Sequence, residues 1–186
     1  MKPIDFLSSR MSVSKLMSPA PNDAVLERVI NAACRAPDHG ALRAWRILIV
    51  RGDSRSALGD LMVNVERETD PNLDESRAAA SKQKAMRAPM IMVVVSATQA
   101  HSKIPAIEQV LAAGCVAHGL LLALQAEGFG AVWKTGAPCY AASMKAGLGL
   151  QPTDDIVGFL YVGTPSAPQQ DSPRPKMHDV TREWTG

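Results

Sequence analysis

The groups best suited to chemistry lie in a polar loop between residues 34 and 45: Arg35, Asp38, His39, Gly40 and Arg43. Binding groups are often found on loops that are held between rigid elements. Two guanidinium groups beside an imidazole suit an anionic ligand, or a planar ligand that forms several hydrogen bonds. The alternative is a helix-to-strand connection with a solvated, charged tip, and this loop alone does not decide between the two.

Two further segments carry a cation beside hydroxyl groups. Arg10 and Ser12 follow a short stretch expected to be helical, and an arginine with a serine two residues later can hold one phosphate through charged and hydroxyl hydrogen bonds. Lys134 and Thr135 follow Trp133 and precede a glycine, which allows a ligand to approach the backbone closely. Each pattern is common on protein surfaces, so the case for a site rests on their combination.

The hydrophobic pattern predicts the elements that would hold these segments. Apolar residues at helical spacing predict a helix that begins at the N-cap Asn22 and ends at Pro37. Unbroken apolar runs at 47–50 and 90–95 predict strands covered on both faces. Further helices are expected at 3–9, 104–127 and 137–150, and further strands at 131–133 and 155–162. Residues 53–86 are polar and predict one helix, or two divided near Asp70, which we interpret as a solvated layer or a lid.

The helix expected at 104–127 is the longest, and from Val110 to Ala126 its clearly polar residues are His118 and Gln125. This apolar run is at the short limit for a membrane span, which needs about 20 residues, and we expect no membrane partner. Its small residues would let another helix approach closely: Ala112, Ala113, Gly114, Ala117 and Gly119. We therefore interpret this helix as the centre of a subunit interface, and His118 as a hydrogen-bonded core residue.

The composition narrows the class of protein. The chain has 186 residues, 46% hydrophobic and 20% charged, as in soluble globular proteins, and we expect one domain over residues 1–186. A net charge of +2 indicates no strongly basic surface of the kind that binds nucleic acid, so a nucleic-acid-binding protein is not expected. Three widely spaced cysteines offer neither a metal-ligand spacing nor a disulfide frame, and without an apolar signal segment a cytoplasmic location is expected. The proline-rich residues 166–186 predict a tail that is disordered or laid on another surface, such as a partner subunit.

Taken together and in order, these motifs resemble the FMN-dependent nitroreductase family, in particular its short, minimal branch. The resemblance covers nearly the whole chain and rests on four blocks: Arg10–Ser12, Ala36–Trp45, Gly128–Thr135 and Gly163–Pro165. It implies an α+β fold with a mainly antiparallel central sheet and helices on both faces. It also implies a homodimer formed through the long buried helix, with FMN at the interface.

Carried over by position, the resemblance implies these cofactor-binding residues: Arg10, Met11, Ser12, Arg35, His39, Trp133, Lys134 and Thr135. The first block would hold the FMN phosphate and ribityl chain, and Arg35 with His39 would meet the polar edge of the isoalloxazine. Trp133 to Thr135 would complete the site from the other subunit. No metal is implied.

The sequence departs from the family pattern at three places. Met11 stands where a second arginine is common, a basic residue near the flavin is displaced to Lys15, and Leu42–Ala44 replaces the usual approach to the tryptophan. Arg35, Lys15 and Arg43 therefore all remain candidates for the cation that faces the flavin.

The activity that the resemblance implies is hydride transfer from NAD(P)H to bound FMN and then to a small-molecule acceptor, a nitroaromatic or a quinone, by a ping-pong mechanism. The flavin carries the chemistry, so no catalytic side chain is expected. The alternative is a non-catalytic dimer that binds or stores flavin. A sulfur- or metal-based redox enzyme ranks third, because the cysteines are unpaired in sequence.

Overall fold

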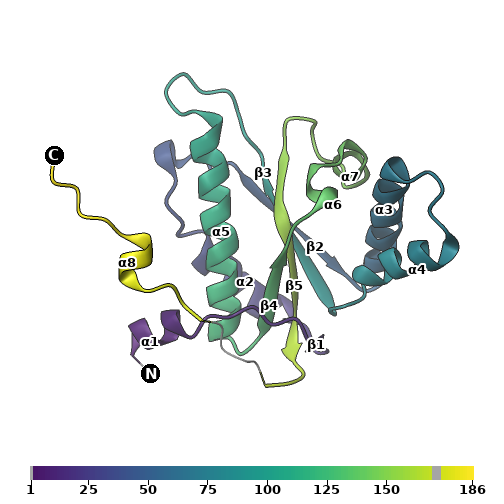
Figure 1. Ribbon diagram of the computed structural model, residues 1–186, viewed down its shortest axis with the longest axis horizontal. Helices are drawn as coiled ribbons and strands as arrows, with labels where there is room; N and C mark the ends of the chain where they lie inside the picture. The colour runs from purple at the N-terminus through teal and green to yellow at the C-terminus, as the bar shows by residue number, and fades with distance from the viewer. Residues whose placement is uncertain (1, 169–172) are drawn as a thin grey trace.

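A computed structural model describes residues 2–168 and 173–186. Its centre is a five-stranded sheet in which every pairing is antiparallel (Figure 1). The strand order is β1 (Leu16–Met17), β5 (Asp155–Pro165), β3 (Met90–Ser96) and β2 (Trp45–Arg51), and β4 (Gly130–Lys134) also pairs with β5. Four successive residues of β5, from Phe159 to Val162, pair with both β3 and β4, so β5 lies between these strands. The expected antiparallel sheet is confirmed.

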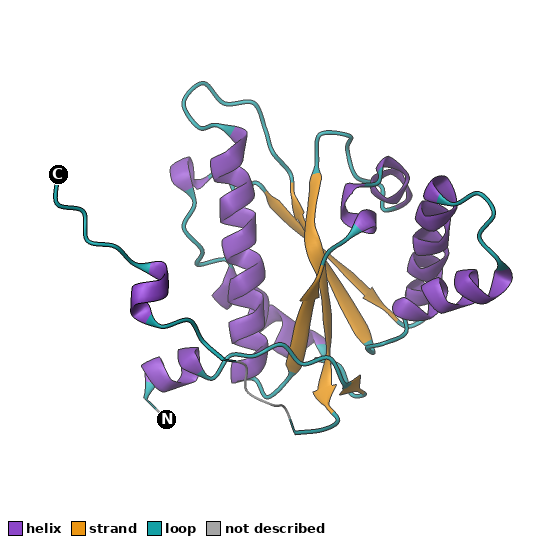
Figure 2. Ribbon diagram, viewed as in Figure 1, coloured by secondary structure: helices purple, strands orange, loops and turns teal. Residues whose placement is uncertain are grey.

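Helices cover both faces of this sheet (Figure 2). On one face lie α2 (Asp23–Ala33) and α5 (Ala106–Ala126); on the other lie α3 (Ser54–Thr69), α4 (Glu75–Lys84), α6 (Ala137–Tyr140) and α7 (Ala142–Gly147). The short helices α1 (Pro3–Ser8), η1 (His39–Ala41) and α8 (Met177–Val180) lie outside these layers. This arrangement is the α+β fold that the sequence predicted.

Strand β3 is the middle of the core, and all seven of its residues are buried. Alternate side chains enter two hydrophobic clusters, because successive residues of a strand point to opposite faces. Met92 and Val94 pack on the α5 side, whereas Ile91 and Val93 pack on the α3 side. The prediction of a strand covered on both faces is confirmed here. It is wrong for β2, where residues 47–49 are half-buried, because this strand lies at the edge of the sheet.

Helix α2 begins as expected, with the side chain of Asn22 accepting a hydrogen bond from the N–H of Val25 at 3.0 Å. Its C-terminal end packs closely on α5. A Cβ at Gly119 would lie 3.0 Å from the Cα of Ala33, so this glycine serves a contact inside the chain. Ala113 and Ala117 are also fully buried within the chain. The expectation that this cluster of small residues meets a partner is wrong for these three.

The face of α5 that remains exposed carries a different set of residues. Ile107 and Leu111 are 60% and 61% exposed, and Cys115 and His118 follow on the same side. The expectation of a buried His118 is therefore wrong. The helix has the length and composition of a membrane-spanning helix, with a mean hydropathy of 1.7 over its most apolar 18 residues, but its other side packs on the sheet and α2.

The segment 53–86 forms two helices divided near Asp70, as predicted. The interpretation of a solvated layer is wrong for α3, because Leu58, Met62 and Val65 are buried against the sheet. The expected helix at 137–150 is two short helices, since Ala141 between them is extended.

The described part of the C-terminal tail extends away from the sheet (Figure 1). The guanidinium of Arg174 donates to the carbonyl of Arg10 at 3.2 Å. Beyond that contact the apolar residues Met177, Val180 and Trp184 are exposed. Residues 169–172 of the predicted tail lie outside the described residues, and a place on a partner subunit stays a prediction.

Candidate functional site

A cavity of about 540 Å³ lies on the α3 side of the sheet, at the end of β4. Specific small-molecule sites occupy roughly 300–1,000 Å³, so its size suits a cofactor ring or a substrate. Its surface is formed by β4 and β5, by α3 and α4, and by the polar segments at Ser14 and after Lys134. The lining residues used in the argument are Ser14, Glu66, Lys84, Lys134, Thr135 and Tyr161.

The N-terminal segment reaches this cavity because it is fixed alongside β4. The N–H of Val13 donates to the carbonyl of Ala131 at 2.9 Å. Gly130 allows this approach, since a Cβ there would lie 2.8 Å from a side-chain carbon of Val13. Ser14 therefore borders the same cavity as Lys134 and Thr135. The N-terminal segment thus meets Lys134 and Thr135 at one edge of the sheet, within one chain, through Ser14, whereas Arg10 and Ser12 do not line this cavity.

Met11 does not border this cavity. It is half-buried and lines a separate cavity of about 220 Å³, together with Gln125 and Phe129 at the C-terminal end of α5. Arg10 is half-buried and Ser12 exposed on the same segment, and neither residue lines either of these two cavities.

An ion pair that no sequence motif indicates lies in the cavity wall. Lys84 on α4 donates to the carboxylate of Glu66 on α3 at 2.6 Å, and to the hydroxyl of Ser81 at 3.4 Å. The hydrogen bond from Lys84 lowers the pKa of Glu66 below its ordinary value. No local motif could have identified this pair, because only the packing of two helices brings the residues together.

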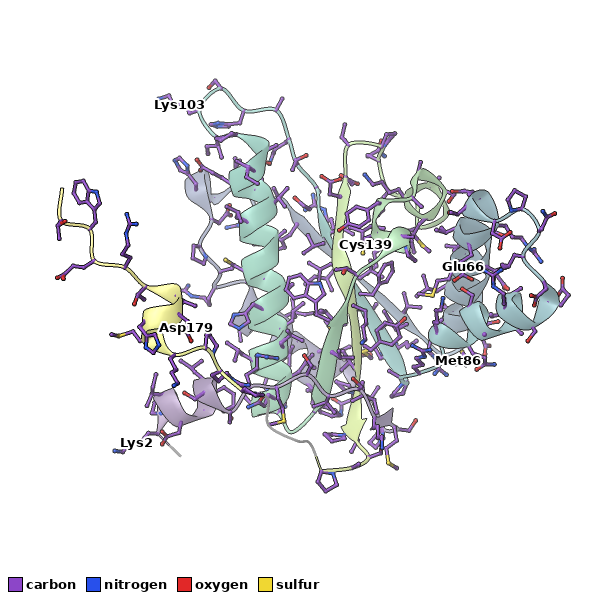
Figure 3. All side chains as sticks on the ribbon, viewed as in Figure 1. Lys2, Glu66, Met86, Lys103, Cys139 and Asp179 are labelled. Carbon is purple, nitrogen blue, oxygen red and sulfur yellow. The ribbon has the colours of Figure 1, made fainter. Side chains whose placement is uncertain are left out.

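Two further polar groups near this cavity keep their protons at neutral pH. Burial raises the pKa of the Tyr161 phenol, whose ring forms part of the cavity floor. Burial also raises the pKa of the Cys139 thiol to about 11, and Figure 3 shows this residue deep in the molecule beside the sheet. A thiol of that pKa is not a nucleophile, so the cavity offers hydrogen-bond donors and cations rather than a covalent catalyst.

The loop between α2 and β2 lies on the opposite face of the sheet. Arg35 lines a second, more open cavity of about 750 Å³ with His118 of α5. The Nδ1 of His39 lies 2.6 Å from the carboxylate of Glu108, in the first turn of α5. The loop is strained, because Ala41 and Arg43 have φ values of 50° and 49°, a region that residues with a Cβ rarely adopt. Such strain is often found at functional sites.

Trp133 belongs to this second cavity, although it adjoins Lys134 in sequence. Its indole N–H donates to the carbonyl of Val157 at 3.2 Å, and the ring occupies the space that a side chain at Gly158 would need. Neighbouring residues of a strand face opposite sides, so Trp133 and Lys134 cannot enter one cavity. The structure therefore groups Trp133 with Arg35, and Lys134 and Thr135 with the N-terminal segment, which differs from the expected grouping.

The cations that border the first cavity are Lys84, Arg87 and Lys134. The three candidates from the sequence, Lys15, Arg35 and Arg43, are exposed and do not line it within this chain. Over residues 2–168 and 173–186, no group of three or more His, Cys, Asp or Glu side chains is arranged to hold a metal ion.

An antiparallel sheet between two helical layers defines an α+β protein, and the cavity beside β4, with its cations and hydroxyls, suits a planar or anionic small molecule. The sequence model of the Nitroreductase family matches residues 7–164, and the chain belongs to this family.

Relatives and solved structures agree with this assignment. The chain is 34% identical to the Escherichia coli K12 protein named "Putative NAD(P)H nitroreductase YdjA", over 168 residues and 89% of each chain. A nitroreductase-like family protein from Bacillus cereus superimposes with a TM-score of 0.86 at 23% identity, covering 100% of this chain and 97% of the other. The FMN and NADPH-dependent nitroreductase NfnB from Sphigopyxis sp. strain HMH gives 0.78 at 22%, with both chains fully covered.

Proposed function

We propose that this chain is an FMN-dependent oxidoreductase that passes electrons from NAD(P)H to a small-molecule acceptor, such as a nitroaromatic or a quinone. The observation that carries the proposal is the meeting of Ser14 with Lys134 and Thr135 around one cavity. A ring with a polar edge and a phosphate tail needs this combination of cations and hydroxyls. The names of the relatives support it, since one is called an NAD(P)H nitroreductase and another is described as dependent on FMN and NADPH.

The donor set of the cavity suits FMN. Lys134 and Thr135 line it and would meet the ring. Arg10 and Ser12 do not line it, but they precede the cavity-lining Ser14 on the same segment and would hold the phosphate and ribityl chain. Bound flavin would supply the hydride chemistry. The chain would supply fixed cations, of which Lys84 is one, and these stabilise negative charge without moving during the reaction.

We propose further that the site is completed by a second copy of the chain. The exposed side of α5, with Ile107 and Leu111, is suited to burial against the same surface of a partner, as twofold symmetry requires. The partner's Arg35, His39 and Trp133 would then approach the cavity from outside. This division agrees with their position on the opposite face of the sheet in one chain. The free cysteines suit a reducing cytoplasm.

Both substrates would use the same exposed face of one ring, so reduction and reoxidation would alternate. Initial rates measured against NAD(P)H at several acceptor concentrations should then give parallel lines, as in a ping-pong mechanism. Intersecting lines would contradict a shared site, because they require both substrates to be bound at once.

Purified protein tests the proposal directly. We expect a yellow protein, or one that becomes yellow with FMN, and its absorbance at the flavin maximum should bleach when NADH or NADPH is added without oxygen. A nitroaromatic or a quinone should restore the colour. Colour that neither nicotinamide bleaches would instead support a flavin-storage dimer. Failure to bind FMN would overturn the proposal.

A further inference from the structure

One carboxylate stands among the cations of the 540 Å³ cavity, in which we propose that the flavin binds. Of the described residues that line it, Lys84, Arg87 and Lys134 are basic, whereas Glu66 alone is acidic. A cavity built only to attract an anion would not need this carboxylate, because it opposes the positive field. Its presence at that place calls for a physical explanation.

The hydrogen bond of Glu66 directs its negative charge towards one cation of the cavity, Lys84. It lies where α3 meets α4 (Figure 3), and its carboxylate accepts a hydrogen bond from Lys84 at 2.6 Å. The side chains remain 34% and 41% exposed, respectively, and both border the cavity. A bound ring can therefore be reached by the ammonium of Lys84 while Glu66 still holds it.

We propose that Glu66 is a positioning residue that holds Lys84 in the cavity wall and partly cancels its charge, and thereby sets the reduction potential of the bound flavin. The inference rests on the proposed function. Reduction adds negative charge to the ring, so a nearby cation favours the reduced form, and a carboxylate against that cation weakens the preference.

The decisive variant is Glu66→Gln, which keeps the size of the side chain and an oxygen that accepts from Lys84. Without the negative charge, we expect the reduced flavin to gain about tenfold in affinity relative to the oxidised flavin. For a two-electron couple this is a rise of about 30 mV in midpoint potential. Lys84→Gln should shift the potential in the opposite direction. With Lys84→Gln already present, Glu66→Gln should shift it less, because the carboxylate no longer has Lys84 to position and only its direct field at the ring is removed.

The chain contains a matched control on the same two helices. Lys82 of α4 pairs with Asp60 of α3 at 2.6 Å, yet neither residue lines the cavity. Asp60→Asn should lower the melting temperature about as much as Glu66→Gln does, without changing the potential. A second variant, Glu66→Asp, retains the charge and should leave the potential near that of the unmodified protein, even if it is less stable.

The readouts are the midpoint potential, measured by equilibration with a reference dye, and the dissociation constants of oxidised and reduced FMN. If Glu66→Gln leaves the potential unchanged, or Asp60→Asn shifts it equally, Glu66 only fastens two helices and the inference is overturned. If the unmodified protein binds no FMN, the proposed function itself fails, which is a different result from a flavoprotein with an unaltered potential.

Discussion

The N–H of Val13 and the carbonyl of Ala131 are joined by a 2.9 Å hydrogen bond, and through it the N-terminal segment becomes part of the cavity. The segment crosses directly over Gly130, where a Cβ would lie 2.8 Å from Val13 and 3.0 Å from Leu16. The position of the proposed phosphate ligands therefore depends on one residue without a side chain.

Gly130→Ala should displace this segment and weaken flavin binding. Overpacking of this kind costs about 1–3 kcal/mol of stability, and both the melting temperature and FMN affinity should fall. Fluorescence titration of the apoprotein measures the second effect. Adding Val13→Ala removes the carbon atom that clashes and should recover part of the affinity. Unchanged FMN binding in Gly130→Ala would mean that the segment need not be fixed there.

Arg10→Ala should reduce FMN affinity by roughly 1.5–3 kcal/mol, the range for a hydrogen bond to a charged group, or about one to two powers of ten. Arg10→Lys should recover only part of the loss, because an ammonium cannot form a forked contact. The same titration applies. Arg28→Ala is the control, since Arg28 lies on α2, outside the N-terminal segment, and pairs with Glu127. Equal affinities for Arg10→Ala and the control would remove Arg10 from the site.

Gly114→Leu tests the proposed dimer. A Cβ at Gly114 would meet no atom of its own chain within 4 Å, so leucine fits the single chain but should collide with a partner on α5. We expect a folded monomer that has lost its flavin, measured by light scattering and absorbance. Ala117→Leu is the contrast, because Ala117 is fully buried within the chain and should lose thermal stability instead. A Gly114→Leu dimer with a full flavin complement would refute this interface.

The three cysteines should differ in reactivity towards a thiol reagent such as DTNB. Cys139 is buried and its pKa is about 11, so it should stay unreactive until the protein unfolds. Cys34 is exposed and should react at once. Cys115 is exposed on α5, so it should be protected in the dimer and react in the Gly114→Leu monomer. Equal reactivity of Cys115 in both proteins would argue against burial of α5 between subunits.

Glu66 and Glu127 are among the carboxyls that make stability depend on pH in the acidic range. Lys84 lowers the pKa of Glu66, and Arg28 lowers that of Glu127, each from an ordinary value of 4.5. A lowered pKa in the folded state adds stability above the unfolded value, and this contribution is lost as pH falls through the folded value. The melting temperature should therefore decline below about pH 4.5, and less steeply in Glu66→Gln. An identical decline in that variant would exclude Glu66 as a contributor.

The elements with unbroken patterns were predictable from the sequence. Strand β3 and helix α5 are long apolar runs, and such runs are expected to form elements that pack in the core. The start of α2 is marked by its N-cap, Asn22. The contacts of small residues were not predictable. Helical spacing identifies Gly119 as a place of close approach, but it does not reveal that Ala33 of the same chain fills that place.

Part of the cavity lining was predictable from residues that are neighbours in sequence. Lys134 with Thr135 was found as a local motif and lines the cavity, whereas a role for Arg10 with Ser12 stays a prediction. The opposite orientation of Trp133 follows from the alternation of side chains along β4, whereas the family resemblance groups Trp133 with Lys134 and Thr135. Glu66 and Lys84 were beyond reach, because they lie 18 residues apart in a polar segment and only the crossing of two helices makes them a pair.

The separation of Arg35 from Lys134 across the sheet has a genetic consequence for a shared site. In the proposed dimer, a chain damaged at Arg10 would still donate an intact Arg35 to its partner, and a chain damaged at Arg35 would still offer an intact phosphate side. In a mixed dimer, twofold symmetry places both defects in one site and leaves the other whole. Two alleles that are each inactive would thus complement when expressed together, whereas two defects on the same face would not.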